Sequence, residues 1–224
     1  GQSVYVNATA SGDPERLLAD LQGLGLAGGE VAGGVVSGRL PIGQLQDAAQ
    51  ASGLRGMVPA YAQTHVGSVW SEADTAHAAP KARSEAGTDG SGQKVCVLSD
   101  SYDQDDSAET TASGDIQSGD LPGPGNPIGN TTPVDVVEEG GEGNTDEGRA
   151  MLQLIHDIAP GAELGFHTAF GGLAVFAQGI GDLADAGCTV IVDDIRYNIE
   201  PFYQDGPVSK AVNEVVESDG VPYF

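Results

Sequence analysis

Short apolar runs alternate with helical patterns through the second half of this chain. The run from Lys94 to Ser99 has the continuous apolar character of a strand buried on both faces of a sheet. The same alternation predicts helices over 147–158, 172–186 and 208–218, and strands over 162–167 and 188–195. Strands that alternate with helices form a mostly parallel sheet with helices packed on it. We therefore expect an α/β fold with a doubly wound parallel sheet here.

The first sixty residues have a different pattern. Asp13 is placed to cap a helix, because Pro14 follows at the first helical position and Glu15 lies in the first turn. The other elements expected here are strands over 4–6, 34–40 and 54–60 and a second helix over 41–52. This β-α-β-α-β order, with tight Gly-rich turns, indicates a small α+β module of the ferredoxin-like kind.

Two connecting segments are poor in regular patterns. Residues 64–92 are rich in Ala, Ser, Gly and charge, with a helix expected over 73–86 and an interruption at Pro80. Residues 103–144 contain one convincing strand, over 133–137, and long stretches of this kind inside a domain are usually functional or mobile. A last strand is expected to begin at 221–224.

The charge of the chain limits its partners. The net charge is −24 and the isoelectric point is near 4.1, which excludes nucleic acid and anionic membranes, because both require a positive surface. A hydrophobic content of 39% over 224 residues is sufficient for a core, and no apolar run is long enough to span a membrane. Such a surface fits either an exported acidic protein or a halophile-like adaptation.

The two cysteines, Cys96 and Cys188, both lie in apolar runs that read as buried strands. We expect two buried thiols in preference to a disulfide, since two cysteines are too few for a disulfide scaffold and no spacing matches a zinc site.

Acidic residues stand where the predicted elements of the second half begin and end. Asp100 follows the first buried strand, at the carboxyl edge of the sheet where catalytic groups gather. Glu147 begins the helix of the run Thr145-Asp146-Glu147-Gly148-Arg149-Ala150-Met151, where the helix dipole favours an anion. Two carboxylates that share a site raise the pKa of one of them, which suits a general base that works in mild acid.

Together with Gly92-Gln93-Lys94-Val95-Cys96-Val97-Leu98-Ser99-Asp100-Ser101-Tyr102-Asp103, this run resembles the N-terminal half of a subtilisin-like serine peptidase catalytic domain. Where that family carries histidine in a His-Gly-Thr-His motif, this chain has Glu147. The resemblance implies that Glu147 is the general base and Asp100 its orienting aspartate, although an ungapped alignment places Ser99 at the aspartate position. Sedolisins also use a glutamate base, but Met151 stands here where they carry aspartate.

Structural alternatives remain for both carboxylates. Glu147 with Asp146 could simply cap the helix, and Asp100 could cap a turn with Ser101 and Asp103. His156 lies about half a helical turn around from Glu147, so we interpret it as a structural residue.

A third segment, from Cys188 to Gly206, resembles the family strand that pairs with the substrate backbone. The resemblance implies peptide recognition by strand addition at Asp194, Ile195, Arg196 and Tyr197. Packing of Tyr197 in the core or in a loop is an equally open alternative.

The resemblance also divides the chain. Residues 1–65 are similar to a pro-domain, and residues 66–224 to the N-terminal part of the catalytic domain. No Ala-Gly-Asn or Gly-Thr-Ser motif occurs, so the expected oxyanion-hole asparagine and nucleophilic serine are missing. We therefore expect a serine endopeptidase present as a fragment that requires a C-terminal segment. The alternative is a non-catalytic peptide-binding relative.

The same resemblance suggests further partners and a location. Protein or peptide substrates and the C-terminal part of the same peptidase are the expected partners. Calcium is the candidate metal, through Asp103, Asp105, Asp106 and the pair Glu138-Glu139, but the signal is weak, because no EF-hand spacing occurs and solvated acidic loops are the favoured explanation of the same residues. A secreted or extracellular location is expected.

Overall fold

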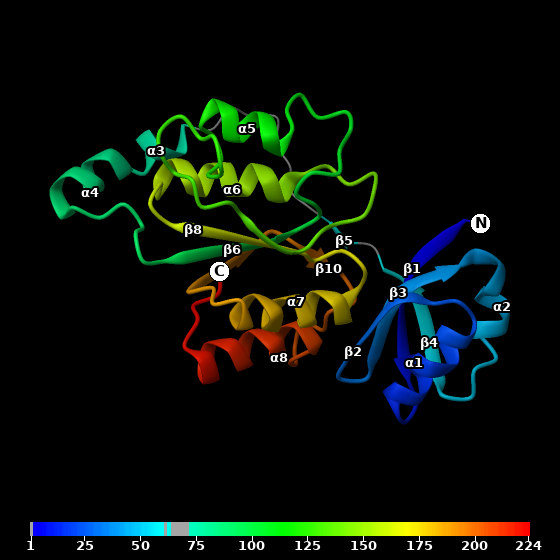
Figure 1. The fold of residues 1–224 in the computed structure, drawn as a ribbon. Coiled ribbons are helices and arrows are strands. Elements are labelled where there is room, and N and C mark those ends of the chain that lie inside the picture. Colours follow the sequence, from blue (N-terminus) through cyan, green and yellow to red (C-terminus); the bar gives the residue numbers. More distant parts are fainter. Residues whose placement is uncertain (1, 61, 64–71) are drawn as a thin grey trace. The chain divides into compact units, whose positions relative to one another are not determined.

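The computed structural model describes residues 2–60, 62–63 and 72–224, and these form two compact units (Figure 1). The first unit comprises Gly1–Gln63, Thr168–Gly181 and Ile195–Gly220; the second comprises Thr64–His167, Asp182–Asp194 and Val221–Phe224. Each unit is described by itself. The domain boundary predicted at residues 65 and 66 lies outside the described residues.

The N-terminal sheet has the ferredoxin-like β-α-β-β-α-β order. Its strands are arranged β2-β3-β1-β4, and all described pairs are antiparallel. The elements are β1 (Ser3–Ala10), α1 (Pro14–Gly23), β2 (Ala27–Ala32), β3 (Val35–Pro41), the 3₁₀ turn η1 (Ile42–Gln44), α2 (Leu45–Ala48) and β4 (Leu54–Pro59). The predicted module is confirmed as a fold, with β2 as an additional strand.

Helix α1 forms because its start is capped and one of its faces is apolar. The Asp13 carboxylate accepts the Glu15 amide at 3.0 Å, and Pro14 supplies a backbone angle that suits the first turn. Leu17 and Leu21, one helical turn apart, are fully buried against the sheet.

Helix α2 is much shorter than the expected helix over 41–52. After η1, only Leu45–Ala48 is α-helical, and no side chain caps its start. Ala48 is the one helix residue that is buried. The short helix leaves part of the sheet near β1 and β4 uncovered.

The rest of the first unit surrounds the start of helix α7 (Leu173–Asp185) and includes β5 (Ala62–Gln63), β10 (Arg196–Tyr197), α8 (Pro207–Glu214) and the π-helical turn η2 (Val215–Asp219). Asn7 Oδ1 accepts the Leu173 amide at 2.9 Å, and Ser37 Oγ accepts the Ala174 amide at 2.9 Å. The Ser37 hydroxyl also donates to Asn7 Oδ1 at 2.8 Å. Gly172 has a φ of 120°, and a Cβ there would lie 2.5 Å from Asn7 Oδ1, so this close approach requires glycine. Two strands of the N-terminal sheet therefore cap α7.

The second unit contains a sheet with the order β7-β8-β6-β9, in which β6 runs parallel to β9 and β7 parallel to β8. Val97, Leu152, Leu164 and Phe166 belong to the buried cluster between this sheet and helices α5 and α6, which lie on one side of it (Figure 1). The elements are α3 (Ala73–Ala76), α4 (Ala79–Ala86), β6 (Lys94–Ser99), α5 (Ala112–Ser118), β7 (Asp135–Glu138), α6 (Glu147–Ile158), β8 (Glu163–Thr168) and β9 (Val190–Asp193). The described residues thus form a mixed α/β structure with a parallel sheet in the second unit, an antiparallel sheet in the N-terminal module and a two-stranded antiparallel sheet of β5 and β10.

The prediction of two free thiols is wrong. Cys96 in β6 and Cys188 just before β9 form a disulfide, with their Cα atoms 5.9 Å apart. β6 and β9 are paired neighbours, and this pairing brings together two residues that are 92 positions apart in the sequence. A count of cysteines says nothing about such a pairing.

None of the described helices is both long enough and apolar enough to cross a bilayer.

Candidate active site

The predicted acidic site lies where β6 ends and α6 begins, within the second unit. The Asp100 side chain is 2% exposed, and both of its carboxylate oxygens accept hydrogen bonds. One oxygen accepts the amide and the hydroxyl of Thr145, each at 2.6 Å. The other accepts the amides of Ser101 at 2.6 Å and Glu147 at 3.0 Å. Asp100 therefore fixes the first turn of α6 against the end of β6.

Glu147 meets the same strand end through its side chain. Its carboxylate accepts a hydrogen bond from the Ser99 hydroxyl. Glu147 is 6% exposed and Ser99 is fully buried. The next residue, Gly148, lies close against Phe166 and the backbone of Ser101, because a Cβ there would clash with the Phe166 ring and lie 2.8 Å from the carbonyl oxygen of Ser101. The structure thus brings Glu147 together with both candidates for the orienting position, Asp100 through the backbone and Ser99 through the side chain.

Asp146 is the N-cap residue of α6 and has a left-handed backbone, with a φ of 55°. Such a conformation is uncommon for a residue with a side chain and requires support from its surroundings. Support comes from the Ser101 hydroxyl at 2.7 Å and the amides of Gln104 at 2.7 Å and Asp105 at 3.1 Å, all of which donate to its carboxylate. Asp146 is therefore a structural anchor that sets the direction of α6 at Glu147.

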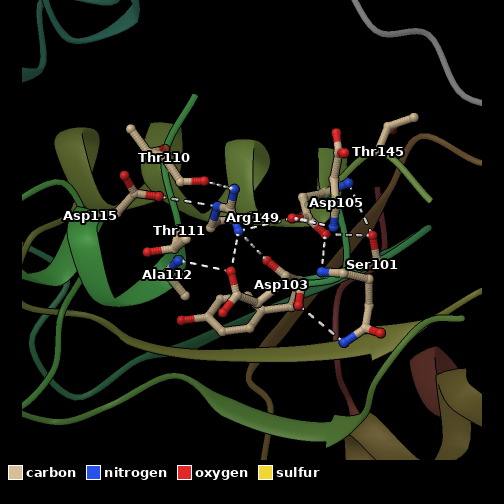
Figure 2. A network of polar contacts seen from close by, with 12 residues as sticks. Ser101, Asp103, Asp105, Thr110, Thr111, Ala112, Asp115, Thr145 and Arg149 are labelled. Carbon is tan, nitrogen blue, oxygen red and sulfur yellow. Dashed lines mark hydrogen bonds and ion pairs between the residues drawn. The ribbon is translucent and has the colours of Figure 1, made fainter. Parts of the chain in front are cut away.

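A buried arginine joins the loop after β6 to α6 (Figure 2). Arg149 is 4% exposed and forms ion pairs with Asp103 at 2.6 Å, Asp146 at 2.9 Å and Asp115 at 3.1 Å. Its guanidinium group also donates to the carbonyl oxygens of Tyr102 at 3.0 Å and Thr110 at 2.8 Å. We call these four charged side chains the Arg149 cluster. Because it binds residues 103–115 to α6, it holds the loop that leads away from Asp100.

The Arg149 cluster places three acidic side chains around one arginine, and most of its side chains are buried. Burial raises the pKa of Asp115 above its usual value, although Arg149 acts in the opposite direction. Burial and the nearby Asp103 raise the pKa of Tyr102 to about 12. This cluster was not predicted from the sequence. The only signal was an arginine in a strongly acidic segment, and two of its three acidic partners, Asp115 and Asp103, lie 34 and 46 positions away in the sequence.

His156 and His167, two histidines of the second unit, have partners away from the end of β6. His156 is buried on α6, with Nε2 3.3 Å from the Asn130 amide nitrogen, and burial lowers its pKa. His167 on β8 has Nε2 3.4 Å from a Glu138 oxygen and 3.5 Å from an Asp182 oxygen.

Several of the acidic residues considered for calcium have protein donors as partners. Asp103 pairs with Arg149, and Asp105 accepts the amide and hydroxyl of Ser107 at 2.8 Å and 2.6 Å. Glu139 accepts the amides of Tyr102 at 2.8 Å and Gly140 at 2.7 Å. Within residues 2–60, 62–63 and 72–224, no group of three or more His, Cys, Asp or Glu side chains could hold a metal ion. The structure gives no observation in favour of calcium.

Two of the four residues predicted to pair with a substrate, Arg196 and Tyr197, lie in a short strand, β10, within the first unit. Arg196 and Tyr197 form it, and it pairs antiparallel with Gln63 and Ala62 of β5. Asp194 and Ile195 lie between β9 and β10. The backbone of β10 is therefore paired with the segment that follows the N-terminal sheet.

The Tyr197 side chain has a packing role, which was the open alternative for this aromatic residue. Its hydroxyl donates to the Ala169 carbonyl at 2.9 Å and accepts the Gly172 amide at 3.1 Å, and burial raises its pKa. A pocket of about 260 Å³ lies beside β10 and is lined by Phe176, Phe202 and other largely apolar residues.

The fold and the site define a mixed α/β protein with buried carboxylates at the carboxyl end of a parallel sheet. No protein-family profile matches the sequence, and no curated protein matches it.

Among solved structures, the chain is similar to "Epidermin Leader Peptide Processing Serine Protease (EpiP) from Staphylococcus aureus", with a TM-score of 0.48 and 10% identity over 97% of this chain and 58% of that one. It is also similar to "MycP1 with the N-terminal propeptide removed", with a TM-score of 0.39 and 17% identity over 67% of this chain and 46% of that one. This chain therefore spans roughly half the length of either protein. Both TM-scores lie below 0.5, so neither likeness identifies a family.

Proposed function

We propose that this chain is the N-terminal part of a subtilisin-like serine endopeptidase in which Glu147 is the general base. The observation that carries the proposal is the convergence of Ser99, Asp100 and Glu147 at the carboxyl end of β6. Parallel α/β sheets place reactive groups at this edge, and a carboxylate held by a hydroxyl and by a fixed backbone has the preorganisation that proton transfer requires.

Each of the three residues has a separate role in this proposal. Glu147 takes the proton of a serine hydroxyl during attack on the peptide carbonyl and returns it to the leaving amine. Ser99 orients the carboxylate of Glu147, and Asp100 positions its backbone amide. The nucleophilic serine and the oxyanion-hole donor are supplied by a C-terminal segment, because no such motif occurs within residues 1–224.

Extended peptide segments are the proposed substrates. The pairing of β10 with β5 supports this, since the backbone of Arg196 and Tyr197 pairs antiparallel with another extended segment. The adjacent pocket of about 260 Å³, lined by Phe176 and Phe202, favours apolar side chains. Asp194 and Ile195 extend the proposed substrate strand.

The N-terminal module and the location are also part of the proposal. A ferredoxin-like module before the candidate site, whose following segment pairs with β10, fits a pro-domain over residues 1–65. The Cys96–Cys188 disulfide supports a secreted or extracellular location, because disulfides persist in oxidising compartments.

A non-catalytic peptide-binding protein is the second candidate function. The burial of Ser99 and Glu147 favours it, because a buried carboxylate that accepts a serine hydroxyl could serve only to fix α6. In that case the strand-pairing edge of β10 would bind peptides without hydrolysis.

Activity of the full-length gene product tests the proposal. We expect a serine that reacts with a fluorophosphonate probe, and we expect Glu147→Gln to lower kcat/KM for a peptide substrate by about 10²- to 10⁴-fold. Glu163→Gln, at an exposed carboxylate on β8, is the matched control and should leave kcat/KM unchanged. A glutamate base predicts a pH optimum below neutrality, whereas a histidine base loses activity below about pH 6.5.

The outcomes separate the candidates. If Glu147→Gln retains activity within a few-fold of the wild type, Glu147 is a helix cap and the base assignment is wrong. If the full-length product contains no fluorophosphonate-reactive serine, the peptide-binding alternative replaces the peptidase.

A further inference from the structure

The N-terminal sheet has an apolar pocket that the proposed peptidase chemistry does not use. It measures about 600 Å³ and lies between strands β1 and β4 and the segment from η1 to α2. Val4, Val6, Met57, Leu45 and Ala49 are among its lining residues. The volume falls within the range of small-molecule binding sites, which are mostly apolar with a few polar groups.

The pocket exists because the second helix of the module is short. α2 ends at Ala48, so the apolar face of β1 and β4 continues beyond the helix that covers it. Ile42 at the rim is 47% exposed, and Ala49 is also exposed. β4 is the edge strand of the sheet, and no described strand lies beyond it. Apolar surface is thus left open on a fold that otherwise buries it.

One cation lies at this pocket. Arg55 on β4 is the single charged residue among its lining residues and forms no ion pair in the described part of the chain. The basic residues of the second unit all have acidic partners there: Lys81, Arg83, Lys94 and Arg149. A guanidinium group beside an apolar cavity is suited to a carboxylate on an apolar ligand.

The charge of the module also permits an anionic ligand. Residues 1–60 contain five acidic and three basic side chains, whereas the whole chain has a net charge of −24. The acidity of the protein is therefore concentrated outside this module. An anionic ligand is therefore repelled less by this module, which contains Arg55, than by the more acidic remainder of the chain.

We propose that this pocket binds an apolar small molecule that carries one carboxylate, with the chain of the ligand against Val6, Leu45 and Met57 and its carboxylate beside Arg55. The ligand class is that of medium-chain fatty acids, and sodium decanoate is the probe. This site is separate from the one formed by Asp100 and Glu147, so its occupancy does not depend on peptidase activity.

Calorimetric titration of the chain with decanoate tests the proposal. We expect saturable binding, and octanoate should bind about 15-fold more weakly, since each buried methylene contributes about fourfold in affinity. Arg55→Gln should weaken decanoate binding by about two- to fivefold, the range for an exposed ion pair, and leave binding of uncharged decanol unchanged. Ala49→Phe, at an exposed lining residue, should fill the pocket and abolish binding of both.

A matched control distinguishes an effect of the charge of Arg55 at the pocket from an effect of the overall charge of the module. Arg39 on β3 is exposed, lies in the same module and is absent from the lining of the pocket, so Arg39→Gln should bind decanoate like the wild type. Circular dichroism with thermal unfolding checks that each variant is folded, and the Arg55 variant tests the proposal even if Ala49→Phe fails to fold.

Several results would overturn the proposal. These are the absence of saturable decanoate binding, equal losses in the Arg39 and Arg55 variants, or equal affinities for octanoate and decanoate. Sedimentation velocity supplies a further one. A concentration-dependent dimer that Ala49→Phe abolishes, without decanoate binding, would mean that a second copy of the chain covers this pocket.

Discussion

Replacing Arg149 with leucine should destabilise the second unit more than the loss of any other single charge in that unit. Arg149 lies against Asp103, Asp115 and Asp146, and the variant keeps the volume of the side chain while removing its charge. Two of the three carboxylates are almost completely buried, Asp115 at 1% exposed and Asp146 at 4%. The variant leaves both without their cation.

The magnitude follows from this burial. Removing one partner of a buried ion pair destabilises a protein by about 3–5 kcal/mol, because an uncompensated charge remains in the interior. The carbonyl oxygens of Tyr102 and Thr110 also lose a donor. Against a typical unfolding free energy of about 5–15 kcal/mol, this is a large fraction. At roughly 2 kcal/mol per molar urea, the midpoint should fall by about 1.5–2.5 M.

Urea unfolding at pH 7, together with hydrogen exchange of the α6 amides, measures this loss. The control is Arg83→Leu, because Arg83 pairs with Asp74 in a partly exposed position and should contribute much less. The penalty of Arg149→Leu should shrink as the pH falls toward 4, since protonation removes the buried charges that the variant leaves unpaired. If the two variants shift the midpoint equally, the Arg149 cluster does not hold the loop to α6 as described.

Two further predictions concern the same unit. The pKa of Asp115 is higher in the folded protein than its ordinary value of 3.8. The contribution of Asp115 to stability is therefore fully present below pH 3.8 and is lost as the pH rises through the raised pKa of the folded protein. Asp115→Asn should therefore gain stability relative to the wild type between about pH 3 and 7, and parallel pH-stability curves would contradict this. Reduction of the Cys96–Cys188 disulfide, which closes a loop with a separation of 92 residues, should lower the free energy of unfolding by about 4–5 kcal/mol. Identical urea midpoints with and without dithiothreitol would show that the disulfide does not form.

Elements with strong periodic or capping signals could be predicted closely. The expected strand over 94–99 and the helix over 147–158 coincide with β6 and α6. The helix expected over 73–86 consists of α3 and α4, and Pro80 lies in the first turn of the second helix, where its missing amide is harmless. In these segments local preference and tertiary packing agree.

Elements stabilised mainly by tertiary contacts escaped prediction. β2 contains two glycines, which are disfavoured in strands, and it is formed by its antiparallel pairing with β3. α5 has the weak helix-forming sequence ASGDIQS, but the Thr111 hydroxyl caps it by accepting the Gly114 amide at 3.2 Å, and Ala112 is buried. Neither the strand pairing of β2 nor the capping and burial of α5 can be read from the hydrophobic periodicity of the sequence.

The candidate site could be predicted in part for a related reason. Strand ends at one edge of a parallel sheet lie close together, so the proximity of Asp100 and Glu147 follows from topology alone. The ion pairs of Arg149 and the pairing of Tyr197 with residue 62 depend on how irregular segments fold back. The hydrophobic pattern of the sequence gives no information on how such irregular segments fold back.

The caps of helix α7 have a consequence for the order in which the chain becomes structured. During synthesis, Asn7 and Ser37 leave the ribosome long before Leu173 and Ala174, whose amides they accept. The acceptors for the first turn of α7 are thus already in place, on two paired strands, when that helix emerges. Until Asn7 and Ser37 reach the N-terminus of α7, the amides of Leu173 and Ala174 must donate to water instead. Helix α7 therefore becomes fully ordered only in a chain whose first forty residues have folded.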